Sequence, residues 1–335
     1  MDSAESAMIL ARRHFLAGAG LAAGGLLLAG CHARQGGAPA GRLRYSVTGK
    51  GDADVRLLLK TAGIAPEGFA IDYSEFSSGQ QVLEAMNGGS LDIGSTSEIP
   101  PIFAAATQSF RQIGIIHGDV NDQVVLVPKG SPIRDLAGLK GKRIGYVRAT
   151  TSQYFLIRML QSVGLGWNDV NPVAMGVSDG AAAFSNGALD AWAIYGFPIE
   201  RALATEGARI LKTALGFLSG NYILVAHKEA LDDPVTVDRI GRFIRVQKRG
   251  YAWAVANEER WAHVVTREIG VPLAYVRDSF ERKSAPYTLR PVTPEAIASQ
   301  QQVADIFAAQ KLIPGTVDVR PLWDDRFNSI IEERV

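Results

Sequence analysis

Three short stretches rich in hydroxyl groups and glycine are the residues of this sequence best suited to binding chemistry. Each is expected to follow a strand and to open a helix, and they are Ser77-Ser78-Gly79, Ser95-Thr96 and Thr150-Thr151-Ser152. The first N–H groups of a helix have no partner inside the helix, and together with nearby hydroxyls they are suited to binding an anion. Converging helix starts therefore predict a site that holds an oxyanion without a counter-charge.

The same stretches have a plainer structural interpretation, because Ser and Thr are the usual residues at helix N-caps. Ser95-Thr96-Ser97-Glu98 also fits a capping box, in which Glu98 would turn back to the backbone of the cap. Binding is favoured because all three stretches occur in the two sheet-forming parts of the chain, where a cleft would lie. Thr48, at the end of the first expected strand, completes this set of candidate ligand-binding residues.

Two aromatic residues, Trp192 and Tyr195, are expected at the end of a strand where a cleft would open. They could contact an apolar ligand tail, although aromatic residues at such points are commonly core residues. Arg148 is a candidate cation for the site, but arginine is mostly a surface residue. Asp52 and Asp54 could meet a positively charged ligand group, and a solvated turn is the alternative.

The elements that must position these residues alternate between short strand-like runs and amphipathic helical stretches. The alternation starts at Leu43 and restarts after Gly130, and it predicts mainly parallel sheets covered by helices. Among the expected helices are Val55–Ala62 and Gly180–Asn186. After the last expected strand, Asn221–Ala226, the chain is expected to be helical to its end. We predict an α/β fold with two inter-lobe crossings, near Val124–Lys129 and Tyr222–Lys228. Residues 43–125 and 226–335 would form lobe one, and residues 126–225 would form lobe two. Ligands in such folds bind in the crevice at the carboxyl ends of strands.

The single cysteine of the chain, Cys31, follows an uncharged run of Ala, Gly and Leu near the first residue. The pair Arg12-Arg13 precedes this run, and Leu28-Ala29-Gly30 leads directly into Cys31, as in a bacterial lipoprotein box. We predict residues 1–30 to be a secretory signal, for which Arg12-Arg13 suggests the twin-arginine route and the Sec route is the alternative, and residues 31–42 to be a flexible linker. Acylation of Cys31 would anchor the protein to a cell-envelope membrane, and an ordinary signal peptide that contains a cysteine is the alternative.

Composition supports a globular domain after this leader. The formal net charge is only +1, without the basic tract that nucleic-acid-binding proteins carry, and 47% of the residues are hydrophobic. No later segment approaches the length of a transmembrane span. Because Cys31 has no second cysteine to pair with, no internal disulfide is expected and packing alone must hold the fold.

Further motifs are spread over nearly the whole chain after the leader. They are Tyr73–Asn87, Gly89–Gly94, Pro100–Phe103, Val125–Ile133, Asp135–Lys142, Gly187–Ile194, Gln301–Asp305 and Leu312–Pro314. In these motifs the chain resembles the aliphatic-sulfonate-binding proteins of ABC importers, a group related to taurine- and nitrate-binding proteins. The resemblance implies a type II periplasmic-binding-protein fold that closes on its ligand between two lobes and delivers it to a permease.

The resemblance also implies ligand-binding segments, which it places at Ser77–Gly79, Ser95-Thr96, Ala149–Ser152 and Asp190–Trp192. Three departures from the family pattern fall on segments expected to face the cleft. They are Tyr45–Gly51 in place of a Gly-Tyr-Gln-Lys-like run, Arg148–Thr151 in place of Lys-Gly-Ser-Ser, and Tyr195–Pro198 in place of Trp-Asp-Pro. These departures bear on the identity of the ligand more than on the fold.

We therefore predict an extracytoplasmic, monomeric receptor that binds a small organic anion, an aliphatic sulfonate first of all. Its partners would be an ABC permease and the ATPase of that importer, with no cofactor, metal or nucleic acid. One alternative is another solute of the taurine, nitrate or vitamin-precursor type, for which acidic residues pointing into the cleft would favour a cation. The other is an enzyme on the same fold, disfavoured because the folded part lacks cysteine and because His117, His227 and His263 show no metal-binding spacing.

Overall fold

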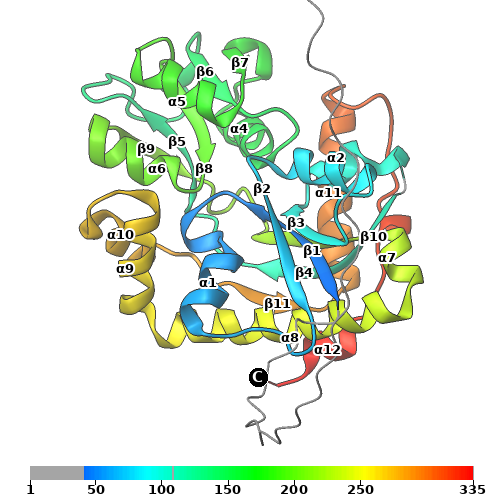
Figure 1. Cartoon of the computed structure of the whole chain (residues 1–335). Coiled ribbons are helices and arrows are strands. Elements are labelled where there is room, and N and C mark those ends of the chain that lie inside the picture. Colours follow the sequence, from blue (N-terminus) through cyan, green and yellow to red (C-terminus); the bar gives the residue numbers. More distant parts are fainter. Residues whose placement is uncertain (1–40, 108, 335) are drawn as a thin grey trace, which may run out of the picture. The chain divides into compact units, whose positions relative to one another are not determined.

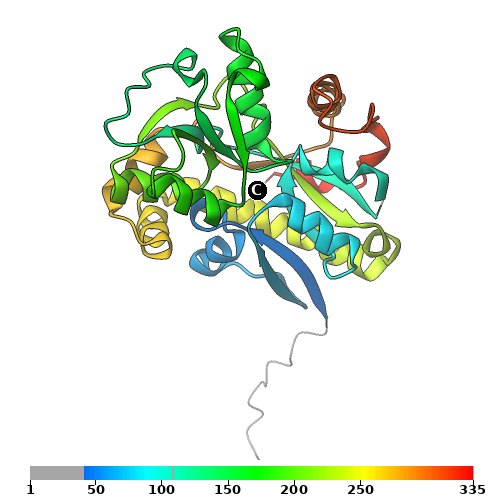
Figure 2. The ribbon, with the colours of Figure 1, turned by 90° about the horizontal axis from the view of Figure 1, so that it is seen from above.

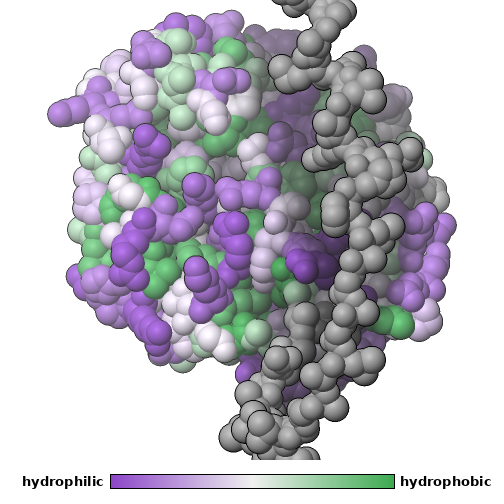
Figure 3. Space-filling view, in the orientation of Figure 1, coloured by the Kyte–Doolittle hydropathy of each residue, from purple (hydrophilic) through white to green (hydrophobic). Residues whose placement is uncertain are grey.

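The computed structural model describes residues 41–107 and 109–334. The predictions for residues 1–30, for Cys31 and for most of the linker lie outside the described residues. Within the described ranges, no helix is both long enough and apolar enough to cross a membrane. Figure 3 shows hydrophilic side chains interspersed with smaller hydrophobic areas on one face of this part of the chain.

The first of two sheets has six strands in the order β11-β4-β10-β3-β1-β2 (Figure 1). Its strands are β1 (Arg42–Thr48), β2 (Ala70–Phe76), β3 (Ile93–Ser97), β4 (Phe110–His117), β10 (Asn221–His227) and β11 (Thr288–Arg290). β11 is the edge strand and pairs with β4, with Leu289 opposite Ile116. This strand corrects the prediction of a wholly helical C-terminal part, because three residues are too few to show a strand pattern in sequence.

The second sheet has five strands in the order β7-β6-β8-β5-β9. Its strands are β5 (Gln123–Val127), β6 (Arg143–Tyr146), β7 (Asn171–Ala174), β8 (Ala191–Tyr195) and β9 (Arg209–Thr213). The chain changes sheet between β4 and β5 and returns between β9 and β10. The lobe boundaries predicted at 125/126 and 225/226 fall inside β5 and β10, so boundaries drawn from the sheets lie a few residues earlier.

Both sheets are mixed, which corrects the prediction of mainly parallel sheets. β1 runs parallel to β2 and β3, and β6 runs parallel to β7 and β8. In contrast, β10 is antiparallel to β3 and β4, and β5 is antiparallel to β8 and β9. A parallel neighbour requires a crossover connection within the same sheet. β5 and β10 arrive instead from the other sheet, and each lies antiparallel to the strands beside it.

Twelve α-helices surround the sheets in the described ranges. They are α1 (Val55–Ala62), α2 (Gly79–Asn87), α3 (Pro100–Phe103), α4 (Thr151–Ser162), α5 (Val177–Ser185), α6 (Pro198–Arg201), α7 (Lys228–Asp232), α8 (Pro234–Ala256), α9 (Glu258–Ile269), α10 (Leu273–Glu281), α11 (Pro294–Ala309) and α12 (Asn328–Glu332). Local signals explain many of their ends. α8 begins at Pro234 because the Asp233 side chain accepts hydrogen bonds from two first-turn N–H groups.

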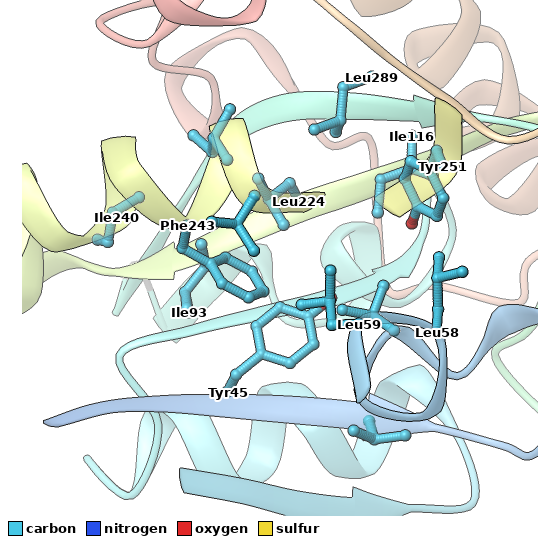
Figure 4. Packing of buried hydrophobic residues seen from close by; sticks show 14 of the residues in the cluster. Tyr45, Leu58, Leu59, Ile93, Ile116, Leu224, Ile240, Phe243, Tyr251 and Leu289 are labelled. Atoms are coloured by element: carbon cyan, nitrogen blue, oxygen red, sulfur yellow. The ribbon is translucent and has the colours of Figure 1, made fainter. Parts of the chain in front are cut away.

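Helices cover both faces of the first sheet. α1 and α8 pack on one face, where the rings of Tyr45 and Phe243 lie 4.7 Å apart and contact Leu58 and Leu59 in the same cluster (Figure 4). The long helix α8, yellow in Figure 2, contributes Ile240 and Phe243 to this cluster. On the other face, residues of α2 and α11 form a second cluster with Ile223 of β10.

The second sheet is built in the same way. Phe155 and Leu156 of α4 pack with Val125 on one face, and Phe184 of α5 packs with Leu126 on the other. Alternating side chains of β5 are buried on both faces, so the whole strand is apolar after Gln123. Rigid packing of this kind fixes the strand ends and helix starts that surround the candidate site.

Candidate ligand-binding site

A pocket of about 500 Å³ lies among strand ends and helix starts of both sheets. Eight of the predicted ligand-binding residues line it. On the side of the first sheet these are Thr48, Ser77, Gly79, Ser95 and Thr96, and on the side of the second sheet they are Thr150, Thr151 and Tyr195. Segments more than a hundred residues apart in sequence are therefore brought around one cavity.

Three of the predicted residues lie outside the pocket lining. Ser78 is the N-cap of α2 and accepts from the Gln81 N–H at 3.4 Å. Ser152 is fully buried, and its hydroxyl bonds to the backbone N–H and carbonyl of Val147 at 2.9 and 3.2 Å. Trp192 is only 1% exposed and packs on Phe184, with ring centroids 5.6 Å apart. Each of these side chains has a structural role in the part of the chain that the structure describes.

Two of the expected helix starts are at the pocket. Gly79 is the first residue of α2, and Thr151 is the first residue of α4, with Thr150 as its N-cap. The Thr150 hydroxyl accepts from the Ser152 N–H and donates to the Val147 carbonyl at 2.8 Å. The pocket thus faces the positive ends of two helices.

The helix expected after Ser95-Thr96 is present, but it is short and Ser95 and Thr96 do not cap it. Residues 95–97 belong to β3, and α3, which follows after Ile99, has only four residues. The predicted capping box is also wrong, because the Glu98 carboxylate accepts hydrogen bonds from Ser219 and Ser299. Burial raises the pKa of Glu98 to about 7.

The start of α5 is a further helix start at the pocket, and the sequence pattern did not place it there. Val177 and Ser178, the first two residues of α5, line the pocket. Their N-cap is Gly176, which makes no side-chain cap, so the first N–H groups of α5 lack the usual side-chain partner. The sequence pattern placed the start of this helix at Gly180, too late to bring it to the cleft.

Two buried hydroxyl groups in the lining lack a partner. Thr96 Oγ1 and the Tyr195 hydroxyl make no hydrogen bond within the described residues. An unsatisfied buried polar group costs about 1–3 kcal/mol, so a ligand that accepts hydrogen bonds would relieve this cost. Burial raises the pKa of Tyr195 to about 12, and its hydroxyl therefore remains a donor at neutral pH.

A polar and aromatic end of the pocket was missed entirely. Tyr222, Tyr251 and Tyr287 line it together with Asp122 and Gln123, which lie where the chain passes from β4 to β5. The ring of Tyr287 lies 6.0 Å from Tyr222 and 5.9 Å from Tyr251. These residues come from separated segments with no common motif. The predicted inter-lobe crossing near Val124 was the one local signal that pointed to Asp122 and Gln123.

Charged residues are placed differently from the sequence expectations. Lys50 and Glu75 line the pocket at exposed positions, whereas Arg148 is exposed and is not among the lining residues. Asp54 is fully buried, which excludes a solvated turn: it caps α1 by accepting from Leu57 N–H and pairs with Arg56 at 2.8 Å.

Asp52 is also engaged within the protein. It pairs with Lys283 at 3.0 Å and accepts from the indole N–H of Trp261 at 2.5 Å. Among the residues that the structure describes, no group of three or more His, Cys, Asp or Glu side chains is placed to hold a metal ion. The pocket therefore offers hydroxyls, helix N–H groups and aromatic rings as its main contacts.

The chain passes twice between two mixed sheets, and a pocket lies at their strand ends. This arrangement defines the class of two-lobed periplasmic binding proteins. Comparison with solved structures agrees. The periplasmic aliphatic sulphonate binding protein SsuA from Escherichia coli is 29% identical, with a TM-score of 0.73, over 85% of this chain and 92% of that one. The alkanesulfonate-binding protein SsuA from Xanthomonas axonopodis pv. citri, bound to MOPS, is 28% identical, with a TM-score of 0.75, over 84% and 98%.

The sequence comparisons identify the family. The family model described as "NMT1/THI5 like" matches residues 64–260. The protein of Escherichia coli (strain K12) named "Putative aliphatic sulfonates-binding protein" is 34% identical over 260 residues, which cover 76% of this chain and 79% of the relative. The chain belongs to the NMT1/THI5-like family and has the periplasmic-binding-protein fold, as predicted.

Proposed function

We propose that this protein is the extracytoplasmic solute-binding receptor of an ABC importer and that its pocket binds an aliphatic sulfonate. The observation that carries the proposal is the convergence of the N-termini of α2, α4 and α5 on one pocket. Within that pocket, Thr96 and Tyr195 hold buried hydroxyls with no partner in the described residues. The relatives named above are described as aliphatic-sulfonate- or alkanesulfonate-binding proteins, which supports the same ligand class.

A sulfonate suits this site because it is a permanent monoanion with three oxygens that only accept hydrogen bonds. Each exposed helix N-terminus contributes about 0.3–1 kcal/mol toward an anion, and up to about 2 kcal/mol when it is partly buried. Hydroxyl and backbone donors add charge-assisted hydrogen bonds. The apolar side chains of Phe76, Ile116 and Phe197 line the same pocket and would cover an aliphatic tail.

The binding reaction would be reversible capture. A micromolar dissociation constant corresponds to about −8 kcal/mol, which three helix ends, several hydroxyls and burial of a short tail can supply. The two lobes, divided between β4 and β5 and between β9 and β10, would close over the ligand and present it to the permease. We expect the receptor to act as a monomer with the permease and its ATPase.

A lipid at Cys31 would keep the receptor at a cell-envelope membrane. This part of the proposal rests on the sequence Leu28-Ala29-Gly30-Cys31. The named relatives are binding proteins, and the only cysteine of the chain precedes the folded part, so a receptor rather than an enzyme is supported.

Thermal-shift screening tests the ligand class. Short alkanesulfonates should raise the melting temperature, and alkylamines and pyrimidines should not. A shift with an amine or a pyrimidine but with none of the sulfonates would contradict the proposal. Steady turnover of any sulfonate or sulfinate by the purified protein would contradict the non-enzymatic role.

A further inference from the structure

A small cavity of about 60 Å³ adjoins the ligand pocket. The two spaces share part of their lining, namely Lys50, Ala53, Asp122, Gly196 and Phe197. The other lining residues of the small cavity include Glu200 of α6 and residues of α9 and α10. A change of charge in this cavity therefore acts on residues that also line the ligand pocket.

The cavity lies at an interface between the two sheet-forming parts of the chain. α6 follows β8 of the second sheet, and α10 precedes β11 of the first sheet (Figure 1). Glu200 of α6 faces Arg282, the residue that ends α10. Pro198, the first residue of α6, and its neighbour Phe197 line the ligand pocket. The packing of α6 on α10, which we call the α6–α10 interface, therefore helps to position one wall of the pocket.

Acidic side chains outnumber basic ones in the lining of the small cavity. Within the described residues, the acidic ones are Asp52, Asp119, Asp122 and Glu200, and the basic ones are Lys50, Arg282 and Lys283. Two of the carboxylates have close partners. Asp119 accepts hydrogen bonds at 2.8–2.9 Å from Asn121 and Ser284, and Asp52 pairs with Lys283 at 3.0 Å. The carboxyl groups of Asp122 and Glu200 are less well supplied.

Glu200 is the carboxyl group at the α6–α10 interface itself. Its side chain belongs to a residue that is only 8% exposed, and the guanidinium of Arg282 lies 4.0 Å away, beyond hydrogen-bond distance. Arg282 also pairs with Asp278 on its own helix. Burial raises the pKa of Glu200 to about 7, more than the neighbouring donors lower it. The charge of Glu200 therefore changes near neutral pH.

We propose that Glu200 makes ligand binding proton-linked: the receptor holds its ligand when this carboxyl group is protonated and α6 stays packed on α10, and it releases the ligand when the group is ionised. This inference rests on the proposed sulfonate-binding function and concerns the regulation of that site. An ionised Glu200 would be a buried charge among three other carboxylates. Its desolvation and their repulsion would loosen the α6–α10 interface.

The direction of the pH effect follows from the charge of the ligand. A bound sulfonate places a permanent negative charge in the adjoining pocket and excludes water from it. Both effects favour the protonated form of Glu200, so the ligand-bound protein holds this proton more tightly than the free protein does. Affinity is therefore highest at low pH, and it falls as the pH rises through about 7 and above.

Other charged groups near α6 are exposed, paired or neutral. The exposed ones are Arg201 on α6 and Arg277, Asp278 and Glu281 on α10. Glu206, which follows α6, accepts from the Ser185 hydroxyl at 2.6 Å. Burial raises the pKa of Tyr222 and of Tyr287 well above the ordinary value, and burial followed by the nearby carboxylates does the same for Asp122. Glu200 thus combines burial at the interface with titration near pH 7.

Calorimetric titration with propanesulfonate between pH 6 and pH 9 tests the proposal. Propanesulfonate does not titrate in this range, so a change in affinity comes from the protein. The affinity should fall by about fivefold or more from pH 6 to pH 9. At about pH 7.5, binding should take up protons, and the binding heat should therefore vary with the ionisation heat of the buffer.

Three variants assign the proton to Glu200. Glu200→Gln imitates the protonated form and should keep its affinity within about twofold over this range, without proton uptake. Arg282→Gln removes a cation that favours the ionised form, so the fall in affinity should move to higher pH. Glu229→Gln, at an exposed position of α7 outside both cavities, is the control and should behave as wild type. Melting curves check that all three variants are folded.

The outcomes separate this proposal from the proposed function. If propanesulfonate binds at no pH, the proposed function itself fails. If it binds equally tightly at pH 6 and pH 9, the proton link is excluded and the sulfonate receptor stands. The proton link through Glu200 is also excluded if Glu200→Gln keeps the wild-type fall in affinity, or if Arg282→Gln moves that fall to lower pH.

Discussion

Gly79 and Thr96 lie against each other at the pocket so closely that a β-carbon on Gly79 would be 1.9 Å from the Thr96 hydroxyl oxygen. The same β-carbon would be 2.9 Å from Thr96 Cβ and 3.1 Å from a side-chain carbon of Pro100. The start of α2 thus approaches β3 more closely than a residue with a β-carbon at position 79 would allow. The absence of a side chain at Gly79 places the free N–H groups of α2 beside the unpartnered Thr96 hydroxyl.

Gly79→Ala should therefore weaken sulfonate binding by at least about tenfold and lower the free energy of unfolding by about 1–3 kcal/mol, the usual cost of overpacking. Calorimetric titration and denaturant unfolding measure the two effects. Gly88→Ala, at the other end of the same helix, is the control, because its β-carbon would come no closer than 3.5 Å to the atoms around it. Equal affinities for wild type and Gly79→Ala would show that the start of α2 does not contact the ligand.

Thr96→Val should reduce sulfonate affinity by about tenfold and should not lower stability, and it should raise the free energy of unfolding by up to about 1–3 kcal/mol. The reason is that Thr96 Oγ1 has no partner within the described part of the protein, so the isosteric change orphans no other group. Thr150→Val is the matched variant. Its hydroxyl caps Ser152 N–H and donates to the Val147 carbonyl, so its loss should lower the free energy of unfolding by about 1 kcal/mol.

Thermal melting and calorimetric titration of the two threonine variants separate binding from stability. A large loss of stability in Thr96→Val would mean that its hydroxyl has a partner in the unliganded protein. An unchanged affinity would remove Thr96 from the proposed site. Either result would indicate that the sulfonate binds at the helix starts of α4 and α5 and not at Thr96.

Ala149 has a backbone φ of 57°, in the left-handed region that favours glycine. It immediately precedes Thr150, and its N–H donates to Gln153 Oε1 at 2.8 Å, which holds the turn before α4. An alanine in this conformation costs about 1–2 kcal/mol, which a glycine would not. A glycine instead loses more conformational entropy on folding, so the two effects offset each other. Ala149→Gly should therefore change the free energy of unfolding by less than about 0.5 kcal/mol.

Ala182→Gly in α5 provides the comparison for Ala149. Ala182 is exposed in a regular helix, where the same substitution should lower the free energy of unfolding by about 1 kcal/mol. Denaturant unfolding of both variants measures the difference. Equal losses at the two positions would show that the turn before α4 is not strained.

Local sequence signals predicted much of this fold because they act within a few residues. The helix Val55–Ala62 was predicted with its observed bounds, since Asp54 caps its start and Gly63 ends it with a φ of 69°. The site residues at a strand end next to a helix start, such as Ser77 and Thr151, were predicted from the same kind of local signal. Their positions relative to one another depend on the sheet order, which no local signal contains.

The missed parts depend on contacts between distant segments. Tyr287 reaches the pocket because β11 pairs with the edge of β4, and that pairing involves only three residues. Trp192 is an aromatic residue near a strand end and was therefore predicted to contact the ligand. The packing of α5 on β8 buries it instead. Glu98 matched a capping box in sequence, and the neighbouring Ser219 and Ser299 gave its carboxylate different partners.

The buried carboxyl group of Glu98 should make the stability of the protein depend on pH. Its pKa is raised from 4.5 to about 7 by burial, more than the hydrogen bonds from Ser219 and Ser299 lower it. The folded state therefore binds this proton more tightly than the unfolded state does. The contribution of Glu98 to stability is fully present below about pH 4.5 and is lost as the pH rises through about 7.

Glu98→Gln imitates the protonated form and should remove this dependence. Relative to wild type, its free energy of unfolding should rise by roughly 2–3 kcal/mol between about pH 5 and pH 8, since one pKa unit corresponds to about 1.4 kcal/mol. Glu67→Gln, at an exposed position, is the control and should show no such trend. Urea unfolding across this pH range measures the difference. A difference between Glu98→Gln and wild type that stays constant with pH would mean that Glu98 is ionised in the folded protein throughout, and that its two serine partners suffice to hold the charge.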